Sequence, residues 1–362
     1  MKTSNMFSLC RSHLQSAAFL LLCTALAAPA VFAQDFWEPG KHAVEVLNSC
    51  TTPLPNNWPV NVTYPRGESG PFPLIAMFNG MECQASWYTD IINHVASWGY
   101  VIVQYTTDFG FPLNPFGGGE REEVQYLAPL LRWLEKEPKL AGKIDFANKA
   151  VMGHSRGGKL AALHYANRTN NFKTAVLIDP VDCSSFAMGP SHPSAIAALA
   201  GKPANCGILP LPPYGHGNLP AAIIGAGIVW MCNPGGSNAE AFNKAVSVQS
   251  LYVTVKGAGH MTFTKPPEES SFWSIINRSC WGGTIASEVA ISEARTMAVA
   301  WLESKFRPSQ ETTNRLARYK QHLSDLTGEG VLTFNWPEGG ALPGSSLPEA
   351  PAGAAAGRRE EL

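Results

Sequence analysis

The stretch "AVMGHSRGGKLAALHYA", residues 150–166, sets a serine between two glycines where an apolar run gives way to a helical pattern. Gly-x-Ser-x-Gly between a strand and a helix is typical of a sharp turn that lifts the serine hydroxyl clear of a sheet. The small residues Gly153 and Gly157 would let the backbone pass close to its neighbours. Ser155 is therefore a candidate nucleophile. The alternative is an ordinary polar residue in a Gly-rich turn, so the rest of the chain must supply a base, an acid and an oxyanion hole.

Strand and helix patterns alternate on both sides of this turn. Apolar residues recur with helical spacing at 86–100 and 287–306, between short apolar runs typical of strands. A further helix carries Leu127, Leu131 and Leu134 on one face and is expected to kink at Pro129. Such alternation predicts a mostly parallel central sheet with helices on both faces. Together with the serine motif, it predicts the α/β-hydrolase fold. The expected strands are 42–47, 60–65, 73–78, 100–106, 150–153, 174–179, 220–227 and 250–257.

The 362 residues are sufficient for one large domain with extensions. Residues 34–308 are the expected catalytic domain, within which the Pro-rich segment 184–218 is an insertion and a candidate lid. Residues 309–336 are expected to form a C-terminal helical extension, and 337–362 a disordered low-complexity tail. The formal net charge of −1 gives no electrostatic footprint for nucleic acid, so no nucleic-acid partner is expected.

The first 33 residues have the pattern of a targeting peptide. Lys2 and Arg11 precede an apolar run, and Val31 and Ala33 stand at −3 and −1 of a cleavage point before Gln34. This pattern predicts a secretory signal peptide and entry into the secretory pathway, to the endoplasmic reticulum lumen or to secretion. A membrane anchor and a plastid transit peptide are the alternatives.

The six cysteines beyond the peptide favour disulfides, although the sequence leaves their pairing open. No motif indicates a metal or an organic cofactor.

A base and an acid should follow the serine in the order Ser, acid, His. His260 follows the last expected strand in "VTVKGAGH", whereas His154 lies inside the serine turn itself. The usual strand for the acid is followed by "IVWMCNPGG", which has no carboxylate. The preceding strand ends in Asp179, which we prefer to Asp182. A loop cap is the simpler interpretation of Asp182.

Two backbone N–H groups should form the oxyanion hole. One would come from Arg156, directly after the serine. The other would come from Met81 in the "NGM" loop that follows the strand 73–78. Asn79 in this loop stands where many hydrolases of this kind have a His-Gly pair. This difference should matter little if only the Met81 backbone donates.

Four stretches, "GHSRGGK", "DPVD", "FWEPGKHAV" and "GAGH", together resemble chlorophyllases over residues 36–306. The resemblance implies a serine carboxylester hydrolase that cleaves the phytyl ester of chlorophyll to chlorophyllide and phytol. It also implies a Ser155–His260–Asp179 triad, no cofactor, a chloroplast location, and a hydrophobic substrate that could draw the protein to membrane lipid or pigment. The "NGM" loop and the 184–218 insertion depart from the family pattern.

An aromatic-lined cleft would suit such a substrate, and seven apolar residues fall in segments expected near the carboxyl edge of the sheet. The alternative, which we expect for at least half of them, is packing in the core or stiffening of loops. The seven residues are Trp87, Tyr88, Phe109, Phe111, Phe116, Trp230 and Met231.

Two other functions stay open: an exported lipase or cutinase-like polyester hydrolase of the same fold, and a non-catalytic hydrolase fold that binds lipid or pigment.

Overall fold

The computed structural model describes residues 34–107, 119–184, 188–207, 215–266, 280 and 282–337. The predicted targeting segment 1–33 lies outside these residues, as does the predicted tail apart from Pro337. No helix in the described part of the chain is long and apolar enough to cross a membrane.

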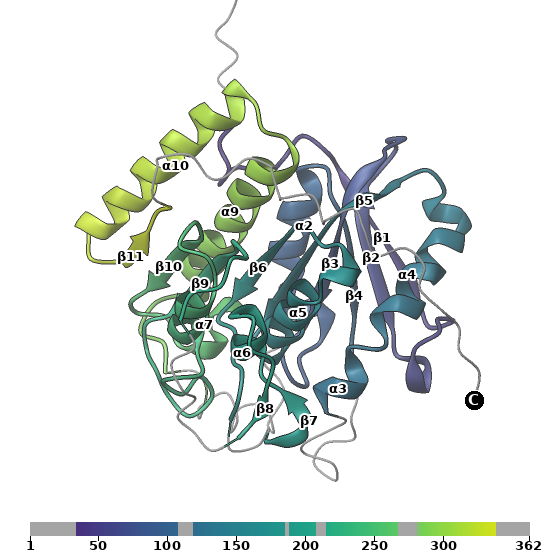
Figure 1. Cartoon of the computed structure of the whole chain (residues 1–362). Helices are drawn as coiled ribbons and strands as arrows, with labels where there is room; N and C mark the ends of the chain where they lie inside the picture. Colours follow the sequence, from purple (N-terminus) through teal and green to yellow (C-terminus); the bar gives the residue numbers. More distant parts are fainter. Residues whose placement is uncertain are drawn as a thin grey trace, which may run out of the picture. The chain divides into compact units, whose positions relative to one another are not determined.

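Nine strands form one sheet in the order β1-β2-β4-β3-β5-β6-β9-β10-β11 (Figure 1). The run from β4 to β10 is parallel, while β1, β2 and β11 pair antiparallel at its two ends. The strands are β1 (Val44–Ser49), β2 (Val60–Pro65), β3 (Phe72–Phe78), β4 (Val101–Tyr105), β5 (Ile144–His154), β6 (Thr174–Ile178), β9 (Ala222–Ala226), β10 (Leu251–Val255) and β11 (Leu332–Asn335). A separate pair is formed by β7 (Gly189–Pro193) and β8 (Asn205–Cys206).

Helices cover both faces of the sheet. The α-helices are α2 (Thr89–Ser97), α3 (Glu120–Glu123), α4 (Leu127–Lys136), α5 (Arg156–Ala166), α6 (Ala195–Leu199), α7 (Ala239–Ala245), α9 (Ser287–Phe306) and α10 (Gln310–Gly328). The short 3-10 helices are η1 (Pro55–Asn57), η2 (Ala85–Tyr88), η3 (Pro138–Leu140), η4 (Arg168–Asn170) and η5 (His260–Phe263). Buried residues of α2 and α9 belong to one hydrophobic cluster, and those of α4, α5, α6 and α7 belong to the other.

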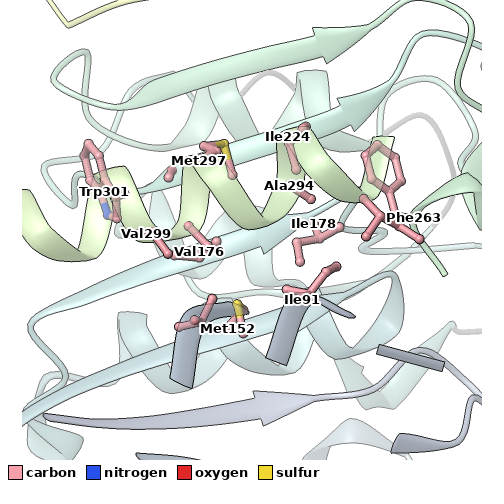
Figure 2. Packing of buried hydrophobic residues seen from close by; sticks show 14 of the residues in the cluster. Ile91, Met152, Val176, Ile178, Ile224, Phe263, Ala294, Met297, Val299 and Trp301 are labelled. Carbon is pink, nitrogen blue, oxygen red and sulfur yellow. The ribbon is translucent and has the colours of Figure 1, made fainter. Parts of the chain in front are cut away.

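The central strands are apolar on both sides because both sides are covered. In β6, Val176 and Ile178 belong to the cluster under α9, whereas Ala175 and Leu177 belong to the opposite cluster. Figure 2 shows the cluster under α9, in which Met297 of α9 lies among side chains from the sheet. Each large side chain buried in this way contributes about 1.5–3 kcal/mol relative to its exposed state.

The predicted kink at Pro129 is wrong. The chain instead breaks between α3 and α4, and Pro129 is the third residue of α4. In the first turn of a helix the missing N–H of proline removes no intrahelical hydrogen bond, so the residue is accommodated without a kink. Leu127, Leu130 and Leu134 form the buried face of α4.

The segment 309–336 forms α10 and then the strand β11, which was not expected. β11 pairs antiparallel with β10 and completes the edge of the sheet. Tyr319 and Leu323 of α10 are fully buried in the same cluster as α9. The extension therefore shares the sheet and the hydrophobic core of the segment that precedes it.

The described part of the 184–218 insertion contains β7, α6 and β8. Three α6 side chains, Ala195, Ile196 and Leu199, are buried in the same cluster as α5. The role of the insertion as a lid stays a prediction. The mostly parallel sheet with helices on both faces confirms the predicted α/β-hydrolase fold.

Candidate active site

Ser155 lies on a strained turn between β5 and α5. Its backbone has φ 56° and ψ −126°, which is unfavourable for a residue with a side chain. Both flanking glycines are required by close backbone approach. A Cβ on Gly153 would stand 2.2 Å from the carbonyl oxygen of Gly157, and a Cβ on Gly157 would stand 2.1 Å from that of Phe78. The expected strand–turn–helix context of the serine is confirmed.

Three predicted site residues meet at the carboxyl edge of the sheet. The Ser155 Oγ lies 2.8 Å from Nε2 of His260, and the His260 Nδ1 lies 2.6 Å from Oδ2 of Asp179. Asp179 directly follows β6, and His260 begins η5 after β10. Parallel strands bring their carboxyl ends to one edge, which is how residues separated by 105 and 81 positions come into contact.

Asp179 is held by more than the histidine. Its Oδ1 accepts a hydrogen bond from the Ala226 N–H at 2.9 Å, and its Oδ2 accepts one from Nδ2 of Asn233 at 3.2 Å. Asn233 is fully buried and belongs to the loop after β9, the strand that lacks a carboxylate. Sequence reasoning missed Asn233, because a neutral amide within "MCNPGG" belongs to no catalytic motif. These contacts fix the carboxylate so that one oxygen faces the imidazole.

Asp182 lies apart from this chain of contacts. It accepts hydrogen bonds from the Ser194 hydroxyl at 2.6 Å, from the Ala195 N–H at 2.8 Å and from the Ile196 N–H at 3.2 Å. The carboxylate therefore caps the N-terminus of α6. Burial raises the pKa of Asp182, against the opposing effects of Lys159 and these hydrogen bonds.

The "NGM" loop after β3 is fixed by buried hydrogen bonds. Asn79 donates from Nδ2 to the Tyr105 carbonyl at 3.0 Å, and its Oδ1 accepts from Gln104 at 3.0 Å. The Gly80 N–H donates to the Tyr88 hydroxyl at 2.9 Å. The Asn79 side chain thus ties the loop to β4, a role that sequence reasoning did not assign to it. Met81, the predicted oxyanion donor, follows directly and leaves its side chain exposed.

Arg156, the other predicted oxyanion donor, is the first residue of α5. Its guanidinium is paired with two buried carboxylates of α3: Nε contacts Glu120 Oε1 at 3.0 Å, and Nη1 contacts Glu123 Oε2. Burial alone would lower the pKa of Arg156, but the charges of Glu123 and Glu120 raise it above its usual value. The side chain therefore anchors the start of α5 to α3.

A second buried cation, Lys159, extends the cluster. Its Nζ lies 3.0 Å from Glu120 Oε2 and 3.8 Å from Asp182 Oδ1. His192 of β7 also contacts Glu120 Oε2 through Nδ1, at 2.9 Å. Burial alone would raise the pKa of Glu120, but the His192 hydrogen bond and the two cations lower it to about 2. The cluster joins α3, α5 and the insertion behind Ser155.

Two disulfides lie close to the site. Cys183–Cys206 joins the residue directly before the insertion to β8 within it, and Cys232–Cys280 involves the residue next to Asn233. Asp182, Cys183 and Cys206 also bring potential metal ligands together, but both thiols are used in the disulfide. Sequence alone could not give the pairing, because it depends on distances between Cα atoms across the fold.

The residues expected to line an apolar cleft differ in their exposure to solvent. Trp87 and Tyr88 are buried. Trp230 and Met231 are exposed by 62% and 55%, in the loop between β9 and the Cys232 disulfide. Phe109, Phe111 and Phe116 lie outside the described residues.

Comparison with known proteins agrees with this architecture. A family model described as Chlorophyllase matches residues 28–324. Chlorophyllase-1 of Arabidopsis thaliana is 26% identical over 256 residues, which cover 66% of this chain and 72% of the relative. "Chlorophyllase-1, chloroplastic" of Citrus sinensis is 24% identical over 306 residues, which cover 81% of this chain and 86% of the relative. The chain therefore belongs to the chlorophyllase family and is a carboxylic ester hydrolase.

Proposed function

We propose that the protein cleaves the phytyl ester of chlorophyll to chlorophyllide and phytol, with Ser155, His260 and Asp179 as its catalytic triad. The observation that carries the proposal is the continuous hydrogen-bonded chain from the Ser155 hydroxyl through His260 to Asp179. Its order along the sequence, Ser, Asp, His, is that of the α/β-hydrolase fold. The names of the relatives supply the substrate.

In the first step His260 accepts the Ser155 proton at Nε2 while Oγ attacks the ester carbonyl. Asp179 accepts the Nδ1–H bond and stabilises the imidazolium that forms. The N–H groups of Met81 and Arg156 receive the oxyanion, which builds up at the N-terminus of α5, where the helix dipole also favours negative charge.

The alcohol leaves with the proton from His260. Water then enters, gives its proton to the same Nε2 and attacks the acyl-enzyme, which releases the acid and restores the serine. No step requires a metal or an organic cofactor.

The test compares two substrates and two serine variants. The wild-type protein should hydrolyse chlorophyll a with a higher kcat/KM than p-nitrophenyl butyrate, measured by chlorophyllide release and by absorbance. Ser155→Ala should lose both activities by about 10⁶-fold in kcat. Ser324→Ala removes an exposed hydroxyl on α10 and should change neither activity.

A preference for the short ester would favour the lipase or polyester-hydrolase alternative. Substantial turnover by Ser155→Ala would overturn the triad itself. Binding of chlorophyll without turnover by the wild-type protein would favour a non-catalytic pigment-binding role.

We also propose that the protein contacts lipid or pigment surfaces near the site. Val229, Trp230 and Met231 are exposed and consecutive, and no charged residue stands between Ala226 and Asn238. Tryptophan favours membrane–water interfaces. Sedimentation with liposomes should recover the wild-type protein, and Trp230→Ser should reduce the bound fraction. Equal sedimentation of both proteins would contradict this contact.

For location, two observations favour different compartments. The two disulfides favour maturation in an oxidising compartment, as a secretory signal peptide would provide. The word "chloroplastic" in the names of the Citrus relatives favours the plastid. We propose the secretory pathway as the destination that residues 1–33 direct, and a fluorescent protein fused behind them should follow it. Accumulation in plastids would establish the alternative.

A further inference from the structure

His154 and Tyr88 make a buried chain of hydrogen bonds behind the site that the proposed mechanism does not use. His154 is the last residue of β5 and is fully buried. Its Nε2 lies 3.1 Å from the carbonyl oxygen of His260, and its Nδ1 lies 2.9 Å from the Tyr88 hydroxyl. The Tyr88 hydroxyl also receives the Gly80 N–H at 2.9 Å.

The direction of every bond in this chain is determined. A carbonyl oxygen only accepts, so Nε2 of His154 carries the proton and donates to His260. Nδ1 of the neutral ring must then accept from the Tyr88 hydroxyl. The Tyr88 oxygen accepts in turn from Gly80. Burial and the nearby His260 lower the pKa of His154 to about 3, so the ring is neutral near pH 7.

The two ends of this hydrogen-bonded chain are the loop of the proposed oxyanion hole and the proposed general base, His260. Gly80 precedes Met81, the predicted oxyanion donor, and a Cβ on Gly80 would lie 3.0 Å from Nδ1 of His154 and 3.1 Å from the Tyr88 hydroxyl. At the other end, the His154 and His260 rings stack with centroids 5.0 Å apart. The Lys265 N–H also donates to the Trp87 carbonyl at 3.0 Å, which joins the segment after His260 to η2 a second time.

We propose that His154 and Tyr88 are positioning residues that hold the oxyanion loop and the His260 loop at a fixed separation. This inference rests on the proposed triad and oxyanion hole. Oxyanion donors and a general base act together only when both are placed within a fraction of an ångström of the reacting atoms. Both side chains are fully buried, so we expect neither to contact the ester. Their effect is therefore on the stabilisation of the transition state and not on binding of the ester.

Tyr88→Phe keeps the ring and removes the hydroxyl that links Gly80 to His154. It should lower kcat for p-nitrophenyl butyrate by about 10- to 100-fold and leave KM within about twofold. Inhibition by a trifluoromethyl ketone, which forms an oxyanion on the serine, should weaken by the same factor as kcat. Tyr100→Phe is the matched control: it removes another buried tyrosine hydroxyl, 2.7 Å from Glu303, and should leave kcat unchanged.

His154→Phe should reproduce the loss in kcat, and Tyr88→Phe combined with His154→Phe should cost no more than either change alone, since both break one chain. His154→Gln, whose amide can both donate and accept, should recover part of the activity lost in His154→Phe. Circular dichroism melting of each variant shows whether it is folded. If either Tyr88→Phe or His154→Phe does not fold, the kcat of the other variant is compared with that of His154→Gln and of the wild type.

Additive losses in the double variant, or an unchanged kcat in Tyr88→Phe, would overturn the positioning role. An increase in KM without a loss in kcat would also overturn it. If Ser155→Ala retains activity, the proposed triad fails. If Ser155→Ala is inactive and Tyr88→Phe is fully active, the positioning role of Tyr88 and His154 fails while the proposed triad stands.

Discussion

Replacing Asp179 with asparagine tests the assignment of the acid, because the structure predicts which way the new amide must face. The Ala226 N–H needs an acceptor, so the amide oxygen stays at the position of Oδ1. The NH₂ group then takes the place of Oδ2, which accepts from His260 at 2.6 Å and from Asn233 at 3.2 Å. Asn233 loses this acceptor and keeps the Ile228 carbonyl, 3.2 Å from its Nδ2. His260 must turn Nδ1 into an acceptor and carry its proton on Nε2, facing Ser155.

In that tautomer His260 cannot accept the serine proton. We expect kcat to fall by about 10⁴-fold, the loss that the wrong imidazole tautomer causes in serine hydrolases. This corresponds to about 5.4 kcal/mol in the activation free energy. The assay is p-nitrophenyl butyrate hydrolysis, with folding checked by urea denaturation.

Asp182→Asn is the matched control. It weakens the cap of α6 and removes the charge 3.8 Å from the buried Lys159. The free energy of unfolding should fall by about 3 kcal/mol, as for other broken buried ion pairs, while kcat stays within about threefold. A kcat of Asp179→Asn within about tenfold of the wild type, or an inactive but stable Asp182→Asn, would refute the assignment.

Three further substitutions have defined outcomes. Gly157→Ala places a Cβ 2.1 Å from the Phe78 carbonyl and should lower kcat for p-nitrophenyl butyrate by about 100-fold, whereas Gly207→Ala, with no atom within 4 Å, should be silent. Burial lowers the pKa of His164 to about 4, whereas the same side chain in the unfolded protein takes up its proton near pH 6.5. The free energy of unfolding should therefore fall as the pH drops below about 6.5. His164→Phe should avoid about 2 kcal/mol of that fall between pH 7 and pH 5, measured by urea titrations. Glu120→Gln leaves two buried cations with fewer counter-charges and should reduce the free energy of unfolding by about 3 kcal/mol; an unchanged urea midpoint would contradict this.

Much of the fold was predictable because its signals are local. The apolar runs around residues 150–166 mark β5 and α5, and the helix 287–306 has the same bounds in the structure. Chain order then placed Asp179 and His260 at the carboxyl ends of β6 and β10, next to Ser155. Their contact follows from the parallel sheet, while their catalytic roles remain proposals.

The parts that were missed depend on contacts between distant segments. Glu120 and Lys159 are 39 positions apart, and only the folded chain brings the two side chains into contact. The hydrogen bond from Asn233 to Asp179 spans 54 positions and involves an amide with no motif of its own. β11 has only four residues, too few for a clear alternating pattern, and its edge position is set by pairing with β10.

The pairing of β11 with β10 has a consequence for truncated forms of the protein. A chain that ended at residue 308 would expose the backbone of β10, whose sequence "LYVTV" is rich in β-branched and aromatic residues. It would also uncover the part of the core that Tyr319 and Leu323 now seal. An open, apolar edge strand is a template for intermolecular pairing, so the shortened protein should aggregate even though every residue of the proposed triad is present. We therefore expect the solubility of the protein to depend on residues 309–336, which supply none of the proposed site residues.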